Sequence, residues 1–278
     1  MTTPTLSFGV RTLGRHYPYE PVDPSGWPRN RWGSVDPDNI PDHVDALPSV
    51  TNILSVCDKP ALKGWAAERA LIELYGSESI PTSLETAVER HKFAFTRYAK
   101  QRADAGTRAH TLAERLTADL PLPSSMSDED AAYADAFMAW WSDHDPSPLN
   151  VEATVMDARY GYAGTADLIA EIDGVPYVVD YKTRAERDDK KLKRYGALYD
   201  ETKMQLAALS QAEEVAEPVG DGWKLAPNTA AMPAMGVVLF PDGTYVTEVV
   251  ELSDIEDRWL PAFLGARQLW AGLKGATA

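Results

Sequence analysis

The stretch GYAGTADLIAEIDGVPYVVDYKTR, residues 161–184, decides the fold class that the sequence predicts. Two apolar runs flank Asp173-Gly174, a dipeptide that favours a two-residue hairpin turn. Each run carries one aspartate, Asp167 or Asp180, among apolar neighbours. A β-hairpin whose strands otherwise suit a protein core therefore has to accommodate two carboxylates.

The register of this hairpin brings the charges together. A two-residue turn places Asp167 directly opposite Asp180, and Thr165 opposite Lys182. Opposed side chains share a face of the sheet, and so do residues two apart in one strand. Two like charges at one buried place are unfavourable, and a divalent cation between them removes the conflict. Oxygen ligands suit one or two ions of Mg²⁺ or Mn²⁺. The alternative is a solvent-exposed strand face, which the apolar neighbours disfavour.

A resemblance supports the metal-site interpretation. Gly164, three residues before Asp167, and the sequence Asp180-Tyr181-Lys182 across the hairpin resemble the GxxD…DxK signature of PD-(D/E)XK nucleases. A preceding helical motif, GTRAH, is similar to that of the RecB-like exonucleases, which include many phage recombination exonucleases. The likeness extends over about residues 48–215. It implies an α/β PD-(D/E)XK fold, with a mixed central sheet of about five strands, flanking helices and an N-terminal helical region.

The same resemblance implies roles for individual residues. The implied metal ligands are His110, Asp167, Asp180 and the backbone carbonyl of Tyr181. The implied catalytic residues are Lys182, Asp180 and Asp167.

Two further residues are candidates for accessory roles. Gln205 matches the first residue of a Gln-x-x-x-Tyr motif that the family often has on the next helix, although Leu209 stands at the Tyr position. Glu152 lies on the strand that precedes the hairpin, where a place near the site and a place on the surface are both open.

The charge distribution singles out one basic segment. The net charge of −15 argues against a surface that is basic throughout. From Lys182 to Arg194, however, seven residues are basic and three are acidic. A local basic stripe of this kind can follow a DNA backbone. The candidate DNA-binding residues are Arg184, Lys190, Lys191, Lys193 and Arg194. The alternative is a solvent-exposed loop and helix start without a ligand.

The remaining chain divides into an irregular segment and one domain. Residues 1–45 are rich in Pro, Gly and aromatic residues, and we expect irregular chain held to the domain by Trp27 and Trp32. Residues 46–278 are expected to form one RecB-like nuclease domain. Its helical part would span 46–147, and its catalytic sheet and flanking helices would span 148–278.

Periodicity and turn residues give the expected elements. We expect helices from Ser49 and over 60–76, 84–116, 126–144, 200–216 and 253–270. We expect strands over 151–160, 164–172, 175–183, 234–240 and 244–252, and a loop over 217–233.

Several classes of protein are disfavoured. Cys57 is the one cysteine, so we expect neither a disulfide framework nor an iron–sulfur cluster. No apolar run approaches the ~20 residues of a membrane helix, and the first residues lack the pattern of a signal peptide. We therefore expect a protein of the cytoplasm, that of the host cell if the gene is a phage gene. A phosphate-binding GxxxxGK[ST] motif is absent, so any unwinding would need a helicase or recombination partner.

These observations favour one function and leave two alternatives. The resemblance implies an Mg²⁺- or Mn²⁺-dependent DNA exonuclease that hydrolyses phosphodiester bonds from single- or double-stranded ends, in phage recombination, replication or repair. One alternative is an endonuclease specific for flaps or branches. The other is a DNA-end binding module with a vestigial site, which the presence of Asp167, Asp180 and Lys182 disfavours.

Overall fold

The computed structural model describes residues 16–19, 46–77, 79, 81–219, 222–228 and 231–274. Trp27 and Trp32 lie outside these residues, as does the rest of the segment 1–45 apart from His16–Tyr19. Within that segment His16–Pro18 forms strand β1, which pairs antiparallel with β2, Ala46–Pro48. The expectation of irregular chain is therefore wrong for the part of the segment that is described.

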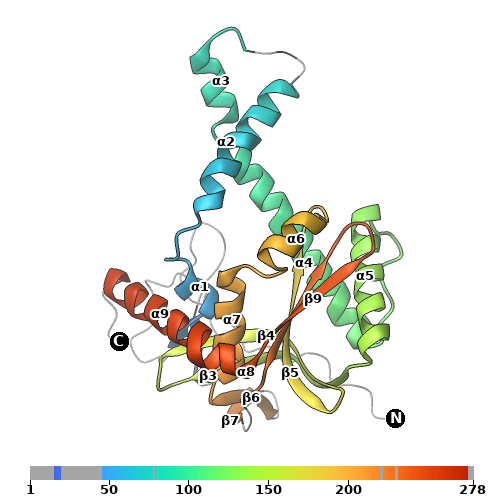
Figure 1. Cartoon of the computed structure of the whole chain (residues 1–278), viewed down its shortest axis with the longest axis vertical. Helices are drawn as coiled ribbons and strands as arrows, with labels where there is room; N and C mark the ends of the chain where they lie inside the picture. Colours follow the sequence, from blue (N-terminus) through green and yellow to red (C-terminus); the bar gives the residue numbers. More distant parts are fainter. Residues whose placement is uncertain are drawn as a thin grey trace.

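A mixed β-sheet forms the centre of the fold (Figure 1). Within the described residues it has seven strands in the order β7-β6-β3-β4-β5-β8-β9. They are β3 (Ser147–Asp157), β4 (Tyr162–Ile172), β5 (Val175–Thr183), β6 (Glu214–Val219), β7 (Gly222–Pro227), β8 (Ala234–Leu239) and β9 (Tyr245–Val250). β5 and β8 are parallel, and the other neighbours are antiparallel. The expected α/β class with a mixed central sheet is confirmed.

The strand number differs from the expected five because of the β6–β7 hairpin. Its residues were expected to end a helix and continue as a loop, an expectation that rested on turn-forming residues such as Pro218 and Pro227. The hairpin lies at one edge of the sheet, and β6 pairs with β3 only through Val215 and Glu214. An edge strand tolerates proline, since fewer of its N–H groups need a partner.

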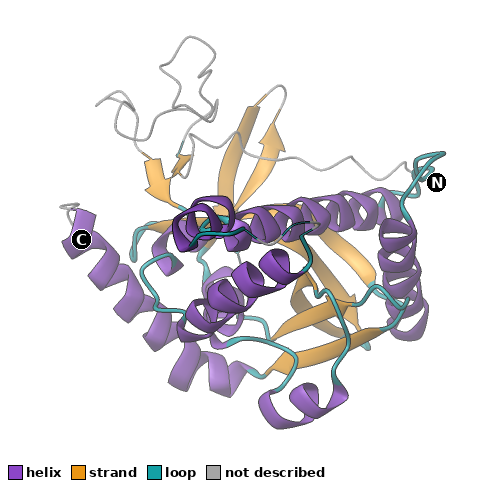
Figure 2. Ribbon diagram, turned by 90° about the horizontal axis from the view of Figure 1, so that it is seen from above, coloured by secondary structure: helices purple, strands orange, loops and turns teal. Residues whose placement is uncertain are grey.

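Helices cover both faces of the sheet (Figure 1, Figure 2). On one face lie α1 (Val50–Leu54), α7 (Asp200–Gln211), the short α8 (Leu252–Asp254), a π-helical turn (Ile255–Trp259) and α9 (Leu260–Lys274). On the other face lie α4 (Ala94–Thr117) and α5 (Asp128–His144). Each face has its own buried cluster, so the sheet separates two hydrophobic cores.

The helices α2 (Pro60–Tyr75) and α3 (Leu84–His91) project from the body together with the first half of α4 (Figure 1). We call this projection the helical arm. The pattern over 84–116 was expected to be one helix, but it is interrupted at Lys92 and Phe93. The Nδ1 atom of buried His91 lies 3.0 Å from Glu73 Oε1, and Arg97 also contacts Glu73, so polar contacts hold α3 and α4 against α2.

Candidate active site

The hairpin at the centre of the sheet has the expected turn. Asp173 and Gly174 have φ angles of 52° and 79°, the positive values that a type I′ turn requires. The expected register then holds from Ile172–Val175 to Leu168–Val179, where the ladder between β4 and β5 ends. Beyond this point β4 continues along β3, and β5 continues along β8. The ladder thus ends one pair before Asp167 and Asp180, and the expected pairing of Thr165 with Lys182 is absent from it.

Asp167 joins the separated strands to helix α4. Its Oδ2 accepts a hydrogen bond of 2.7 Å from the backbone N–H of Tyr181. Its Oδ1 lies 3.1 Å from Nδ1 of His110, which α4 presents to the sheet. The carboxylate therefore fills the place where the next backbone pair of the β4–β5 ladder would have formed.

Asp180 is held by two other groups. The Lys182 ammonium lies 2.5 Å from its Oδ2, and the amide of Gln205 donates to its Oδ1 at 3.1 Å. Gln205 comes from α7, so Asp180 is contacted from its own strand and from the helix above it. Leu209, one turn further along α7, is buried in the core and takes no part in this contact.

The electrostatics of the two aspartates differ. Burial opposes ionisation of Asp167, but His110, Lys182 and the Tyr181 N–H outweigh it and lower its pKa. Burial raises the pKa of Asp180; Lys182 opposes this rise, and the charge of Asp167 adds to it. The pKa of Lys182 is raised, because the two aspartates outweigh the effect of burial. The pKa of His110 is also raised, because Asp167 outweighs burial.

Glu152 lies near the two aspartates and feels their charges. Of the two positions that the sequence left open, near the site or on the surface, the structure has the first. Burial, and then the charge of Asp167, raise the pKa of Glu152 to about 7, and Asp180 and Glu114 add to the shift. Glu152 also has a positive φ of 51° within β3, between the paired residues Val151 and Ala153. This strained backbone interrupts the ladder beside Asp167.

The described residues do not form a complete metal cluster. Among them, no three His, Cys, Asp or Glu side chains are arranged to hold an ion. The chemistry of the donors nevertheless fits Mg²⁺ or Mn²⁺, since three carboxylates supply hard oxygen ligands. Burial, and then the charges of neighbouring acids, raise the pKa values of Asp180 and Glu152, and a divalent cation would neutralise this negative charge. The ligand set therefore stays a prediction.

Comparisons with known proteins add little to this picture. No protein-family model matches the chain, and no curated protein matches its sequence. Among solved structures, an alkaline exonuclease (LHK-Exo) from Laribacter hongkongensis is similar over 76% of this chain and 96% of that chain. The two are 12% identical, with a TM-score of 0.31. A likeness at this level assigns neither a fold nor an activity.

The five candidate DNA-binding residues lie on one short helix and on the segment before it. Lys190, Lys191, Lys193 and Arg194 lie on helix α6 (Asp189–Tyr195), which begins where the Asp188 side chain accepts from two backbone N–H groups. Lys191 is 3.3 Å from Asp188 and so is already paired. Arg184 precedes this helix and donates to the carbonyl of Ala197.

Two residues near the site were not expected from the sequence. Glu114 follows His110 by one helical turn, and its charge raises the pKa of Glu152. The four-residue spacing on α4 was the signal that could have indicated it. Tyr17 of β1 contacts Thr165 through their hydroxyl oxygens, 3.0 Å apart, and feels the charge of Glu152. No signal in the sequence indicates that Tyr17 lies here.

No helix within the described ranges is both long and apolar enough to cross a membrane.

Proposed function

We propose that this protein is a metal-dependent DNA exonuclease of the RecB-like PD-(D/E)XK kind. One observation carries the proposal: Asp167, Asp180 and Lys182 meet where β4 and β5 separate, with His110 and Gln205 in direct contact with the two aspartates. A protein with a purely structural hairpin would gain nothing from three buried or half-buried charges at this point, because their desolvation is costly.

The proposed site would use its residues as follows. Asp167 and Asp180, with His110 and the Tyr181 carbonyl, would hold one or two ions of Mg²⁺ or Mn²⁺, which would polarise the phosphate and lower the pKa of a bound water. Lys182 remains protonated beside the aspartates and would neutralise charge that develops on the phosphate. Gln205 orients Asp180 by donating to Oδ1, which leaves Oδ2 toward Lys182. Glu152 is a further acid that can exchange a proton near neutral pH.

The direct test is digestion of end-labelled linear DNA beside covalently closed circles, with Mg²⁺, with Mn²⁺ and with EDTA. We expect linear DNA to be degraded with either metal, and circles and EDTA reactions to stay intact. Lys182→Ala should lose cleavage while it retains DNA binding. Lys224→Ala, at an exposed lysine of the edge strand β7, is the matched control and should cleave like the wild type.

Other outcomes would select the alternatives. Circles that are cut as fast as linear DNA would identify an endonuclease. DNA that is bound but never cut, with either metal, would identify a binding module. A folded Lys182→Ala protein with full cleavage would remove Lys182 from the site.

A further inference from the structure

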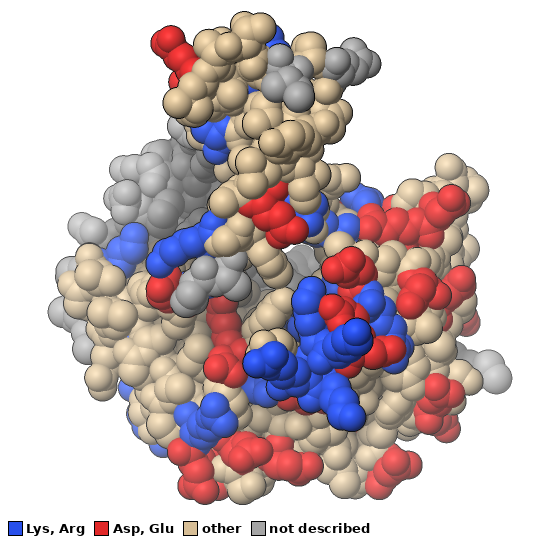
Figure 3. Space-filling model, turned by 45° about the horizontal axis from the view of Figure 1, so that its top comes forward, with Lys and Arg blue, Asp and Glu red and all other residues tan. Residues whose placement is uncertain are grey.

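A cleft lies between the helical arm and the segment that joins β5 to α6. It has a volume of about 670 Å³, and residues of α2 and α4 line one side of it. Thr183 and Arg184 line the other side, directly after Lys182 in the chain. Figure 3 shows a hollow between the arm and the body, with Lys and Arg side chains gathered at its edge. The cleft therefore begins beside the candidate catalytic residues.

The walls of the cleft carry exposed aromatic rings and guanidinium planes. Trp65 of α2 is 44% exposed, and Tyr199, before α7, is 58% exposed. The guanidinium of Arg184 lies over the Tyr199 ring at 4.6 Å, and that of Arg69 lies over the Tyr98 ring at 4.1 Å. Exposed planar groups facing a concave space suit nucleobases, which stack on aromatic and guanidinium faces. Inside a duplex the faces of the bases are covered, so this surface suits unpaired bases.

The charges in and around the cleft suit a DNA strand whose bases lie inside the cleft and whose phosphates lie outside it. Four basic and three acidic side chains line it, so its interior is close to neutral. Lys190, Lys193 and Arg194 lie nearby on α6 and form no ion pair with another described residue. A strand with its bases in the cleft and its backbone along α6 would match both surfaces.

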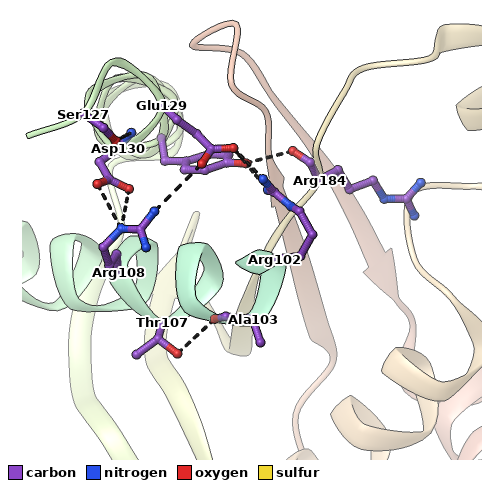
Figure 4. Close-up of polar contacts among 9 residues, drawn as sticks. Arg102, Ala103, Thr107, Arg108, Ser127, Glu129, Asp130 and Arg184 are labelled. Atoms are coloured by element: carbon purple, nitrogen blue, oxygen red, sulfur yellow. Dashed lines mark hydrogen bonds and ion pairs between the residues drawn. The ribbon is translucent and has the colours of Figure 1, made fainter. Parts of the chain in front are cut away.

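The cleft wall is held in place by a polar network between α4 and α5 (Figure 4). Arg102 donates to Glu129 at 2.5 Å and to the Tyr133 hydroxyl at 2.6 Å. The same hydroxyl donates to the carbonyl of Arg184 at 3.0 Å. The network joins α4, α5 and the end of β5, so the two sides of the cleft keep their spacing in the free protein.

We propose that this cleft binds the unpaired bases of a single-stranded DNA end and leads that strand to the candidate catalytic residues. The proposal deepens the proposed function and rests on it for the fate of the strand. It selects single-stranded ends, or duplex ends with a single-stranded overhang, over blunt duplex ends.

The test is fluorescence anisotropy in EDTA, in which binding is measured without cleavage. The probes are a labelled single-stranded oligonucleotide and a blunt duplex of the same sequence. The wild type should bind the single strand more tightly. Trp65→Ala and Tyr199→Ala should each weaken single-strand binding about fivefold or more, which is the loss expected for one stacked base. The dependence of binding on salt should stay unchanged, since neither variant removes a charge.

Tyr75→Ala is the matched control, because Tyr75 is 75% exposed on the same helix as Trp65 but does not line the cleft. It should bind both probes like the wild type. Thermal unfolding checks that the variants are folded, and we expect this because the substituted residues are exposed. The proposal is overturned if Trp65→Ala and Tyr199→Ala both bind the single strand like the wild type, or if the wild type prefers the blunt duplex.

The result is separable from that of the cleavage assay. Loss of single-strand binding in the two variants supports the cleft even if no metal gives cleavage, in which case the proposed nuclease function fails. If the wild type cleaves DNA and the variants bind the single strand as the wild type does, the proposed nuclease function is supported and the proposed role of the cleft is rejected.

Discussion

Asp167 and Asp180 illustrate how one site treats two buried carboxylates differently. Asp167 accepts from a backbone N–H and faces a histidine, and its pKa is lowered. Asp180 is the more deeply buried, and its pKa is raised despite the lysine beside it. Cationic partners offset part of the repulsion between the two carboxylates, although the charge of Asp167 still contributes to the raised pKa of Asp180.

Glu152 should make the stability of the metal-free protein depend on pH. Its pKa is about 7 in the folded protein and about 4.3 in an unfolded chain. The folded state therefore binds this proton more tightly, so the contribution of Glu152 to stability falls as the pH rises from about 4.3 to about 7. In EDTA, Glu152→Gln should exceed the wild type in unfolding free energy at pH 8 by on the order of 1–3 kcal/mol, after allowance for partial exposure. Near pH 5 the difference should be much smaller.

Chemical denaturation at both pH values measures this difference. Glu171→Gln is the matched control, because Glu171 is an exposed glutamate on the neighbouring strand β4. The unfolding free energy of Glu171→Gln should differ little from that of the wild type, and by the same amount at both pH values. A Glu152→Gln variant whose stability relative to wild type is equal at pH 5 and pH 8 would show that neither burial nor neighbouring acids raise the pKa of Glu152.

The sequence predicted the acids and the lysine of the site better than their partners. The Asp173-Gly174 turn fixes which residues of the hairpin share a face, so Asp167, Asp180 and Lys182 followed from local rules. The contact between His110 and Asp167 joins residues far apart in the chain, and the family resemblance, not periodicity, pointed to it. The ladder ends at Leu168, and beyond it the Asp167 side chain accepts from the Tyr181 N–H, which no local pattern shows.

At the scale of elements, two glycines test how closely the helices pack on the sheet. A Cβ on Gly164 would lie 2.6 Å from Leu209 Cδ2, so α7 or the leucine would have to move. Gly164→Ala should therefore destabilise the protein by about 1–3 kcal/mol. Gly265→Ala is the control, since Gly265 lies in the exposed face of α9 with nothing within 4 Å of a new Cβ. It should be neutral or stabilise by up to about 1 kcal/mol. Thermal unfolding of both variants checks the contrast, and equal effects would contradict it.

Glu248 joins the edge strand β9 to the start of α7. Its Oε2 accepts from the N–H groups of Ala197 and Leu198 at 2.6 and 2.9 Å, and Lys203 lies 2.6 Å from Oε1. Burial opposes ionisation, but Lys203 and the N–H groups outweigh it and lower the pKa of Glu248. The carboxylate therefore stabilises the fold above about pH 4.3, and this contribution is lost as the pH falls through its lowered pKa.

Glu248→Gln should lower the melting temperature at pH 7 by about 2–6 °C, from a loss of about 1–2 kcal/mol after allowance for partial exposure. The loss should shrink below about pH 4, since the wild-type carboxylate then gains its proton. Exposed Glu251 follows the same strand, and Glu251→Gln should melt like the wild type at both pH values. A Glu248→Gln loss that does not depend on pH would mean that shape, not charge, holds this contact.

The elements with strong local signals were predicted and those at the edges were not. Ser49 and Ser127 cap two of the expected helices, each accepting from a backbone N–H three residues later. The β6–β7 hairpin was missed because its prolines and glycines are typical of loops, and only its place at the sheet edge makes them acceptable. The end of α3 was missed because neither Lys92 nor Phe93 is a helix breaker, and the interruption depends on contacts with α2.

At the scale of the whole molecule, an acidic protein presents a small basic surface. The net charge is −15, yet Lys190 and Lys193 are exposed on α6 and have no ion pair among the described residues. Lys190→Glu and Lys193→Glu together should weaken binding of single-stranded DNA. The slope of log K against log salt should fall by about 0.7 for each phosphate that the variant no longer neutralises. Anisotropy titrations in EDTA at several salt concentrations measure the slope. Lys274→Glu, at the end of α9, is the control for net charge and should change the slope little.

An unchanged slope in the double variant would show that α6 does not bind the DNA backbone. Lys191 should contribute less than its neighbours, because its ion pair with Asp188 has to break before it can bind a phosphate.

Helix α4 connects the helical arm to the candidate site as one continuous rigid element. It runs without interruption over 24 residues, a length of about 36 Å, and carries Tyr98 beside the cleft and His110 beside Asp167. A helix resists bending because bending stretches its own hydrogen bonds, so a force applied at the arm is carried along the axis and not absorbed between the two ends. Tension on a strand held in the cleft would thus be carried along α4, past the contacts of Arg102 with α5, to the contact between His110 and Asp167.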